Sequence, residues 1–112
     1  MDDLFLKIID REIPANIIYE DDDILAFEDI NPQAPTHILI IPKKHIAKLS
    51  DADISDQKLL GHMLIKANEI ATNLKLDNTF RLVINNGANA GQSVFHLHMH
   101  LLSGRGFSWP PG

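Results

Sequence analysis

The most informative stretch of the chain is Val94-Phe95-His96-Leu97-His98-Met99-His100-Leu101-Leu102, because histidines and apolar residues alternate through its middle. Successive side chains of a β-strand point to opposite faces of the sheet. The pattern therefore predicts a strand over residues 94–102 with three histidines on one face and an apolar core face opposite. A half-exposed strand needs polar residues on its outer face, but it does not need three imidazoles, so the histidines are candidate functional residues.

The rest of the chain predicts helices and strands on short connections. A short amphipathic helix is expected over residues 4–11, with Asp2 or Asp3 as its N-cap, and a longer one follows Ser50 with apolar residues at helical spacing. The acidic run at residues 20–23 is typical of a solvated hairpin turn. Further strands are predicted at residues 16–19, 24–27, 36–41 and 80–84. This order indicates an α+β domain with a five-stranded antiparallel sheet and two helices.

The composition excludes several classes of protein. With 112 residues the chain has the size of one domain, expected to span residues 1–112 with 104–112 as an extended C-terminal tail. It has no cysteine, so a disulfide, a cysteine nucleophile and a thiolate metal site are all excluded. A net charge of −5 argues against nucleic acid and anionic membranes as partners. We also expect no signal peptide and no membrane span, hence a soluble cytoplasmic protein.

Three imidazoles on one face support two kinds of chemistry. His-x-His on a strand can place two nitrogens on a zinc ion, but zinc sites also need carboxylates that orient their histidines, and this strand contains no acid. Alternatively, a neutral imidazole attacks an electrophile while its neighbours supply hydrogen bonds and protons near neutral pH. We favour the nucleophile, with no metal and no cofactor, and keep the metal site as the alternative.

The loop before the histidines is a candidate anion site. Gly87 and Gly91 permit tight turns that bring main-chain N–H groups close to an anion, and Gln92 and Ser93 add neutral donors. The loop lacks the Gly-Lys-Ser/Thr ending of a P-loop. A Gly- and Asn-rich connection between strands would have the same composition, so the argument depends on the position of the loop beside the histidines.

Three separated blocks of the chain resemble one known family. Residues 91–102 are similar to the signature of the histidine-triad (HIT) superfamily, in which histidines at alternate positions precede two apolar residues. Residues 29–46, from Asp-Ile-Asn-Pro to Lys-Lys-His-Ile, resemble the first motif block of its Hint branch. The ending Trp109-Pro110-Pro111-Gly112 resembles the C-terminus of that branch. The resemblance covers nearly the whole chain.

The resemblance implies a homodimer, in which the sheets of two subunits form one continuous sheet, and a purine nucleoside phosphoramidase activity. The middle histidine, His98, is expected to attack the α-phosphorus of a nucleoside 5′-phosphoramidate, such as an adenylated amine. The amine leaves, and water hydrolyses the nucleotidyl-histidine. His96, His100 and the earlier His37 are expected to complete the hydrogen-bonding and proton-handling set.

The resemblance also assigns contacts to the purine nucleotide substrate. Asn85, Gln92 and Ser93 are expected around the phosphate and leaving group, and Asp29 at the ribose hydroxyls. A carboxylate can bond two hydroxyls at once, although an aspartate before Asn-Pro is also an ordinary turn residue. Apart from the resemblance, a lone tryptophan beside two prolines is poorly explained as exposed filler, so Trp109 is expected to dock near the subunit interface and shape the leaving-group side of the site. The residues expected to sandwich the purine fit a core equally well: Leu4, Phe5, Ile8, Ile13, Phe27 and Ile30.

Two other functions stay open. Dinucleoside polyphosphate hydrolases of the superfamily also keep three histidines, but they do not usually carry the Trp-Pro-Pro-Gly ending. A nucleotide-binding regulatory or interaction protein with incidental hydrolysis is the other alternative. Nucleotidyl transferases tend to have glutamine at the third position of the triad, where this chain has His100. His45 is assigned no role, and His62 is expected on a partly exposed helix surface.

Overall fold

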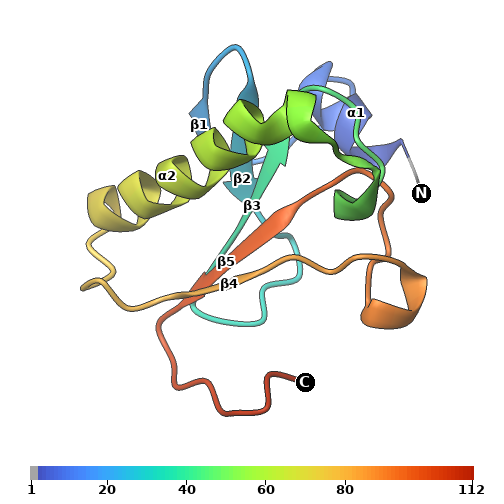
Figure 1. Ribbon diagram of the computed structural model, residues 1–112. Coiled ribbons are helices and arrows are strands. Elements are labelled where there is room, and N and C mark those ends of the chain that lie inside the picture. The colour runs from blue at the N-terminus through green and yellow to red at the C-terminus, as the bar shows by residue number, and fades with distance from the viewer. Residues whose placement is uncertain (1–2) are drawn as a thin grey trace.

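The computed structural model describes residues 3–112 and shows an antiparallel sheet of five strands in the order β1-β2-β3-β5-β4 (Figure 1). The strands are β1 (Ile17–Glu20), β2 (Ile24–Glu28), β3 (Thr36–Pro42), β4 (Arg81–Val83) and β5 (Met99–Ser103). Within the described residues the α-helices are α1 (Leu4–Ile9) and α2 (Gln57–Asn73), with 3₁₀ turns at Leu49–Asp51, Ile54–Asp56 and Ala88–Ala90. The predicted α+β class is confirmed. Asp2, one of the two N-cap candidates, lies outside the described residues.

β3 is the central strand, and its sequence explains why. It pairs with β2 along one edge and with β5 along the other. Every residue from His37 to Pro42 is buried. Ile38 and Ile40 point to one face of the sheet while Leu39 and Ile41 point to the other, because strand side chains alternate. A strand that is apolar on both faces needs a cover on both sides.

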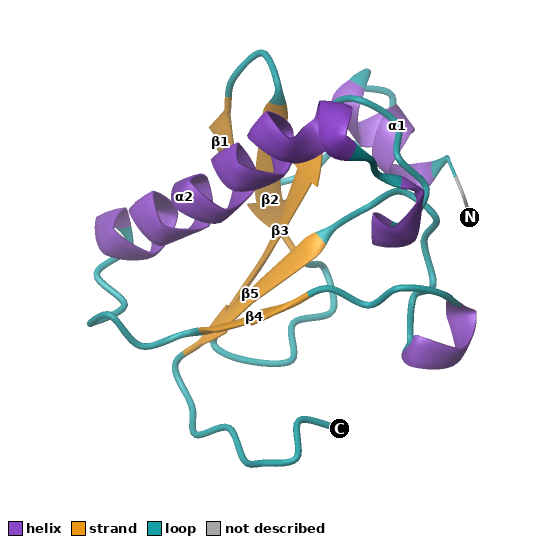
Figure 2. Ribbon diagram, viewed as in Figure 1, coloured by secondary structure: helices purple, strands orange, loops and turns teal. Residues whose placement is uncertain are grey.

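The two helices provide those covers, one on each face of the sheet (Figures 1 and 2). α2 lies on the face of a first apolar cluster, formed by Ile24, Ala26, Ile38, Ile40, Met63, Ala67, Ile70, Met99 and Leu101. α1 lies on the opposite face, in a second cluster formed by Phe5, Ile8, Leu25, Phe27, Leu39 and Ile41. The histidine face of β5 is on the α1 side, where Phe5 of α1 packs edge-on against the rings of His96 and His98.

The strand predicted over residues 94–102 is correct only in its second half. β5 begins at Met99, and residues 94–98 do not join the ladder with β3. The backbone N–H of Leu97 instead donates to the carbonyl oxygen of Ile46, in the loop after β3, at 2.6 Å. A loop distant in sequence therefore holds this segment, and the alternation pattern alone could not reveal it.

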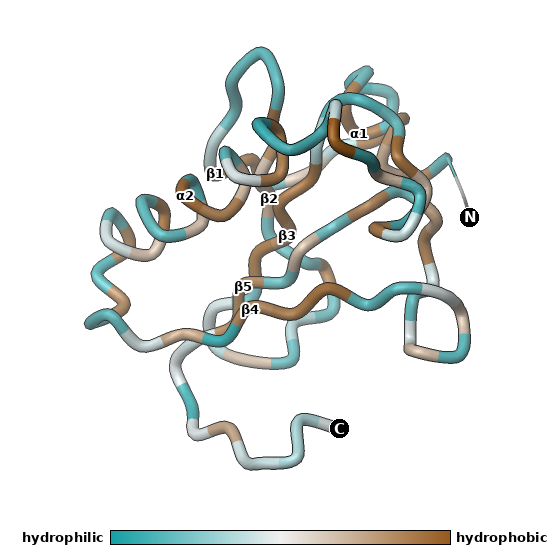
Figure 3. Tube along the Cα trace, in the orientation of Figure 1, coloured by the Kyte–Doolittle hydropathy of each residue, from teal (hydrophilic) through white to brown (hydrophobic). Residues whose placement is uncertain are grey.

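The acidic turn between β1 and β2 is not merely solvated, although the loop is hydrophilic (Figure 3). Asp21 Oδ1 accepts hydrogen bonds from the backbone N–H groups of Asp23 and Ile24, each at 2.8 Å. Its Oδ2 accepts from the hydroxyl of Tyr19 at 2.8 Å and lies 2.8 Å from Nε2 of His62 on α2. Burial alone would raise the pKa of Asp21, but these hydrogen bonds outweigh it and hold the pKa well below its usual range. His62 is partly exposed, as expected, and ties α2 to the hairpin.

The chain after β5 contains neither helix nor strand (Figure 2). Arg81 of β4 donates from Nη2 to the carbonyl oxygen of Ser108, and Arg105 donates from Nε to that of Gln33, both at 2.9 Å. Both guanidinium groups lie over the Phe107 ring, 5.0 Å and 4.3 Å from its centroid. These contacts attach the tail to the rest of the domain without β-sheet hydrogen bonds. Among the described residues, no helix combines the length and apolar character needed to cross a membrane.

The Asp21 network yields a stability prediction. Asp21→Ala should lower the free energy of unfolding by about 2 kcal/mol at pH 7, because it removes an acceptor shared by several donors. A carboxyl with a lowered folded pKa contributes stability above its ordinary value of 3.8 and loses it as the pH falls. The difference from the wild type should therefore shrink below about pH 4. Urea unfolding at several pH values measures it, and the exposed neighbour in Asp22→Ala is the control; equal midpoints for Asp21→Ala and wild type at pH 7 would contradict the network.

Candidate active site

A cavity of about 560 Å³ opens on the α1 side of the sheet, between α1, β2, β3 and the loop that precedes β5. Its apolar wall includes Leu4, Phe5, Ile8, Ile13, Phe27, Leu39 and Val94. Its polar lining includes Asp29, Gln33, His37, Ser93, His98 and His100. Ile30 is 96% exposed and lies at the mouth. The fold thus joins an apolar surface to a group of imidazoles.

Four of the residues predicted for the site do not line this cavity: His96, Asn85, Gln92 and Trp109. Trp109 is 84% exposed on the tail. Asn85 lies behind Gly91, where an added Cβ would come 3.6 Å from Asn85 Nδ2, and the φ of +100° already favours glycine there. Gly91 therefore presents its main chain, with no side chain, at the surface of the cavity.

Gln92 holds the loop before β5 in shape. The residue is buried, and its Oε1 accepts a hydrogen bond from the backbone N–H of Gly87 at 2.8 Å. Its Nε2 donates to the carbonyl oxygens of Ala47 at 2.8 Å and Val94 at 3.0 Å. These bonds occupy the amide inside the protein, so Ser93 is the neutral donor of this pair that faces the cavity.

The hydrogen bonds of His98 define which of its nitrogens can react. Nδ1 lies 2.8 Å from the carbonyl oxygen of His96, which can only accept, so Nδ1 carries the proton. In the neutral ring Nε2 then holds a lone pair and is the free nitrogen at the cavity. The Phe5 ring packs edge-on against His98, with centroids 5.1 Å apart, and keeps the imidazole in place. His98 is thus a neutral imidazole with an oriented nucleophilic nitrogen.

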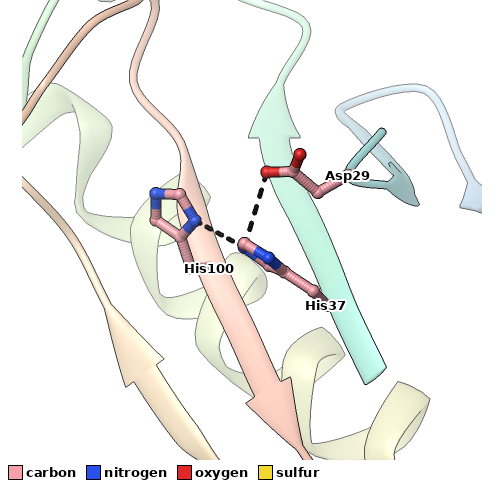
Figure 4. A group of neighbouring side chains, drawn as sticks. All are labelled: Asp29, His37 and His100. Carbon is pink, nitrogen blue, oxygen red and sulfur yellow. Dashed lines mark hydrogen bonds and ion pairs between the residues drawn. The ribbon is translucent and has the colours of Figure 1, made fainter. Parts of the chain in front are cut away.

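His37 and His100 form a second, connected pair (Figure 4). The backbone N–H of Gln33 donates to His37 Nδ1 at 3.0 Å, so a neutral His37 carries its proton on Nε2. That Nε2 lies 2.9 Å from Nδ1 of His100 and 3.5 Å from Oδ2 of Asp29. His37 therefore donates to His100, and the proton of His100 is on its Nε2. The cavity then presents a nucleophilic nitrogen from His98 and an N–H donor from His100.

Burial keeps these rings neutral. Desolvation lowers the pKa of His37, His96 and His98 below 6.5. The pKa of His100 is lowered to about 4, first by desolvation and then by the neighbouring His98 and His37, against the Asp29 carboxylate, which raises it. A neutral ring is what a nucleophile requires at pH 7. Burial therefore favours the competent neutral form of His98 at that pH.

The same hydrogen bonds decide whether a metal fits. Asp29, His37 and His100 are the cavity residues whose ligand atoms are close enough to share an ion. A metal on His37 Nε2 would require the proton to move to Nδ1, where the backbone N–H of Gln33 already points. The donor set therefore fits a proton shared between two imidazoles better than it fits a cation.

The protein thus has an antiparallel α+β fold with a cluster of imidazoles at one end of an apolar cavity. The chain belongs to the HIT domain family, whose model matches residues 10–107. An uncharacterized HIT-like protein of Synechocystis is 63% identical over 111 residues, which cover 99% of this chain and 97% of that protein.

Solved structures show the same fold. The HIT family hydrolase from Legionella pneumophila has a TM-score of 0.95 and 53% identity, covering 97% of this chain and 98% of the other. A histidine triad nucleotide-binding protein from Candida albicans has a TM-score of 0.82 and 37% identity, covering 97% of this chain and 83% of its own. These similarities establish that the protein is a member of the HIT domain family.

The burial of the imidazoles predicts an NMR titration. His100 should titrate near pH 4, and His37 and His98 below 6.5. Asp29→Asn should lower the midpoints of His37 and His100 further, because the carboxylate that favours their charged forms is lost. Ring ¹⁵N shifts followed from pH 8 to pH 3.5 measure this. A His100 midpoint at 6.5 would show that the ring is solvated and would contradict this arrangement.

Proposed function

We propose that this protein is a hydrolase that cleaves the P–N bond of purine nucleoside 5′-phosphoramidates through a covalent nucleotidyl intermediate on His98. One observation carries the proposal: His98 donates its Nδ1 proton to the carbonyl of His96 at 2.8 Å, which leaves Nε2 free beside an apolar cavity. The description of the Legionella relative as a hydrolase and of the Candida relative as nucleotide-binding supports the same class of reaction.

The cavity suits a nucleoside. Its volume of about 560 Å³ is within the usual range for small-molecule sites. Phe5, Ile8 and Phe27 offer apolar surfaces for a purine ring. Asp29 accepts the backbone N–H of Asn31 on Oδ1 at 2.8 Å, and a carboxylate with about four lone-pair sites retains room for ribose hydroxyls.

The two imidazoles divide the chemistry. Nε2 of His98 attacks phosphorus, the P–N bond breaks, and the departing nitrogen takes a proton from a solvent water while the Nε2–H of His100 donates a hydrogen bond to that nitrogen. The hydroxide that remains attacks the nucleotidyl-histidine, bonds to phosphorus and releases His98 as the neutral ring. The products are the amine and the nucleoside monophosphate. A single nitrogen cannot be a free nucleophile and a hydrogen-bond donor together, which is why the pair is needed.

Phosphate recognition in this proposal depends on neutral donors. None of the described residues that line the cavity is lysine or arginine. The available donors are the hydroxyl of Ser93, the Nε2–H of His100 and the main chain around Gly91. Neutral donors attract phosphate at short range only, so we infer that binding depends weakly on salt.

We also propose a homodimer that joins two sheets across β4. β4 is at the edge of the sheet, paired with β5 alone among the described strands. An unpaired edge is a template for a further strand. Leu64 and Ile65 of α2 are 52% and 62% exposed, an unusual apolar surface for a helix that faces water. A second copy would cover both features.

The central prediction concerns His98. His98→Ala should lower kcat/KM for an adenosine phosphoramidate by at least about 10³, since it removes the atom that forms the covalent bond. Activity should persist in a chelator without added metal. His62→Ala, which removes an imidazole outside the cavity, is the matched control and should keep the wild-type rate per folded molecule.

Several results would contradict this prediction. Near-wild-type turnover by His98→Ala, or loss of wild-type activity in EDTA with recovery on zinc, would each exclude the proposed mechanism. A substrate panel separates the alternatives. Faster cleavage of dinucleoside polyphosphates would indicate the other hydrolase branch, and tight nucleotide binding without turnover would indicate an interaction protein.

The tail yields a separate prediction. Trp109→Ala should change selectivity among leaving amines by several-fold while nucleotide binding changes little, because the indole is expected near the leaving group across the subunit interface. Equal effects on all substrates would contradict this role.

The proposed homodimer can be tested directly. Sedimentation equilibrium should give twice the 12.5 kDa of one chain, and a monomer at the concentration of the activity assay would exclude a site shared between subunits.

A further inference from the structure

The segment that carries the reactive histidine is not held by the sheet. Residues 94–98 precede β5 and lie outside its ladder. They are bonded instead to the loop at residues 43–48, since the backbone N–H of Leu97 donates to the carbonyl oxygen of Ile46 at 2.6 Å. Just before the segment, Gln92 Nε2 donates to the carbonyl oxygen of Ala47 in the same loop at 2.8 Å. The loop at residues 43–48 therefore holds residues 94–98 in place.

His96 makes the most specific of these contacts. The residue is 0% exposed and does not line the cavity. Its Nε2 lies 2.7 Å from the carbonyl oxygen of Pro42, and its Nδ1 lies 3.1 Å from Nδ1 of His45. A carbonyl only accepts, so Nε2 of His96 carries the proton. The buried ring is neutral, its Nδ1 is an acceptor, and His45 must donate to it.

These bonds leave His96 no proton to give to a substrate. Its only N–H is committed to Pro42, and its lone pair is committed to His45. The residue is still connected to the reactive nitrogen, because its backbone carbonyl accepts the Nδ1–H of His98 at 2.8 Å. A ring fixed at both nitrogens restricts the rotation of residue 96 and hence the direction of that carbonyl. The position of His98 therefore depends on the ring of His96.

We propose that His45 and His96 are positioning residues that keep His98 in the Nδ1–H tautomer with Nε2 at the cavity. The functional part of this inference rests on the proposed role of His98 as nucleophile, whereas the structural part rests on geometry alone. His45 is an exposed loop residue, yet its Nδ1–H is the donor that completes the environment of the buried ring.

Three variants test this role. His45→Ala removes the donor, while His45→Asn keeps an N–H close to the position of the imidazole Nδ1. Lys48→Ala is the control in the same loop, since its side chain has no hydrogen-bond or ion-pair partner among residues 3–112. Single-turnover kinetics with an adenosine phosphoramidate measure formation of the nucleotidyl-histidine, and a melting curve for each variant confirms folding.

His45→Ala should slow formation of the nucleotidyl-histidine by about tenfold or more, which is typical of the loss of a residue that orients a reactive group. KM should stay within about twofold of the wild type. His45→Asn should recover to within about threefold of the wild type, and Lys48→Ala should match it. A wild-type rate in His45→Ala, or equal slowing in His45→Ala and His45→Asn, would overturn the inference.

An assay without substrate separates this inference from the proposed function. Ring ¹⁵N spectra of the free protein at pH 7 should show His98 in a single Nδ1–H tautomer, and His45→Ala should show a mixture of tautomers. An unchanged His98 tautomer in His45→Ala overturns the inference even if catalysis is slowed. If no nucleotide substrate is turned over but the tautomers mix as expected, the proposed function fails and the positioning role stands.

Discussion

The antiparallel register of β3 against β5 is the constraint on which both the core and the site depend. Thr36 pairs with Ser103 and Ile40 with Met99, which places His37 diagonally from His100 on one face. The two rings then meet at 2.9 Å. A slip by one residue would turn the histidines toward α2 and expose Met99 and Leu101 to the cavity. Core packing and imidazole pairing therefore select the same register.

Burial of the imidazoles has both a benefit and a cost for the proposed chemistry. Desolvation lowers the pKa of His98, so the ring is neutral at pH 7, but a less basic nitrogen is also a weaker nucleophile. The structure compensates through orientation, with the ring held between Phe5 and the carbonyl of His96. Phe5 of α1 belongs to the second apolar cluster and also to the wall of the cavity. The second apolar cluster and the site are therefore one packed unit.

Sequence alone predicts the parts of this site that follow from local geometry. Alternation along residues 99–102 is enough to separate His100 from Met99 and Leu101, because these residues are in strand β5 and strand side chains alternate. The end of the ladder at Met99 was not predictable from this pattern, since the loop around Ile46 imposes it from a distance. The buried amide of Gln92 was missed for the same reason: a Gly- and Asn-rich loop does not indicate which of its polar groups turns inward.

The proposed recognition of phosphate by an acidic chain, without a cationic side chain among the described residues of its cavity, has a physical rationale. A lysine or arginine would stabilise the bound substrate and the transition state alike, and uniform binding does not accelerate the chemical step. In the proposed mechanism positive charge develops on His98 only as the P–N bond breaks, and the donor of His100 strengthens its bond to nitrogen at the same moment. The Asp29 carboxylate favours the charged form of His98, so it favours that developing charge and disfavours the anionic product. In the proposed mechanism this arrangement would therefore stabilise the transition state more than either bound anion, and it would also promote release of the nucleotide.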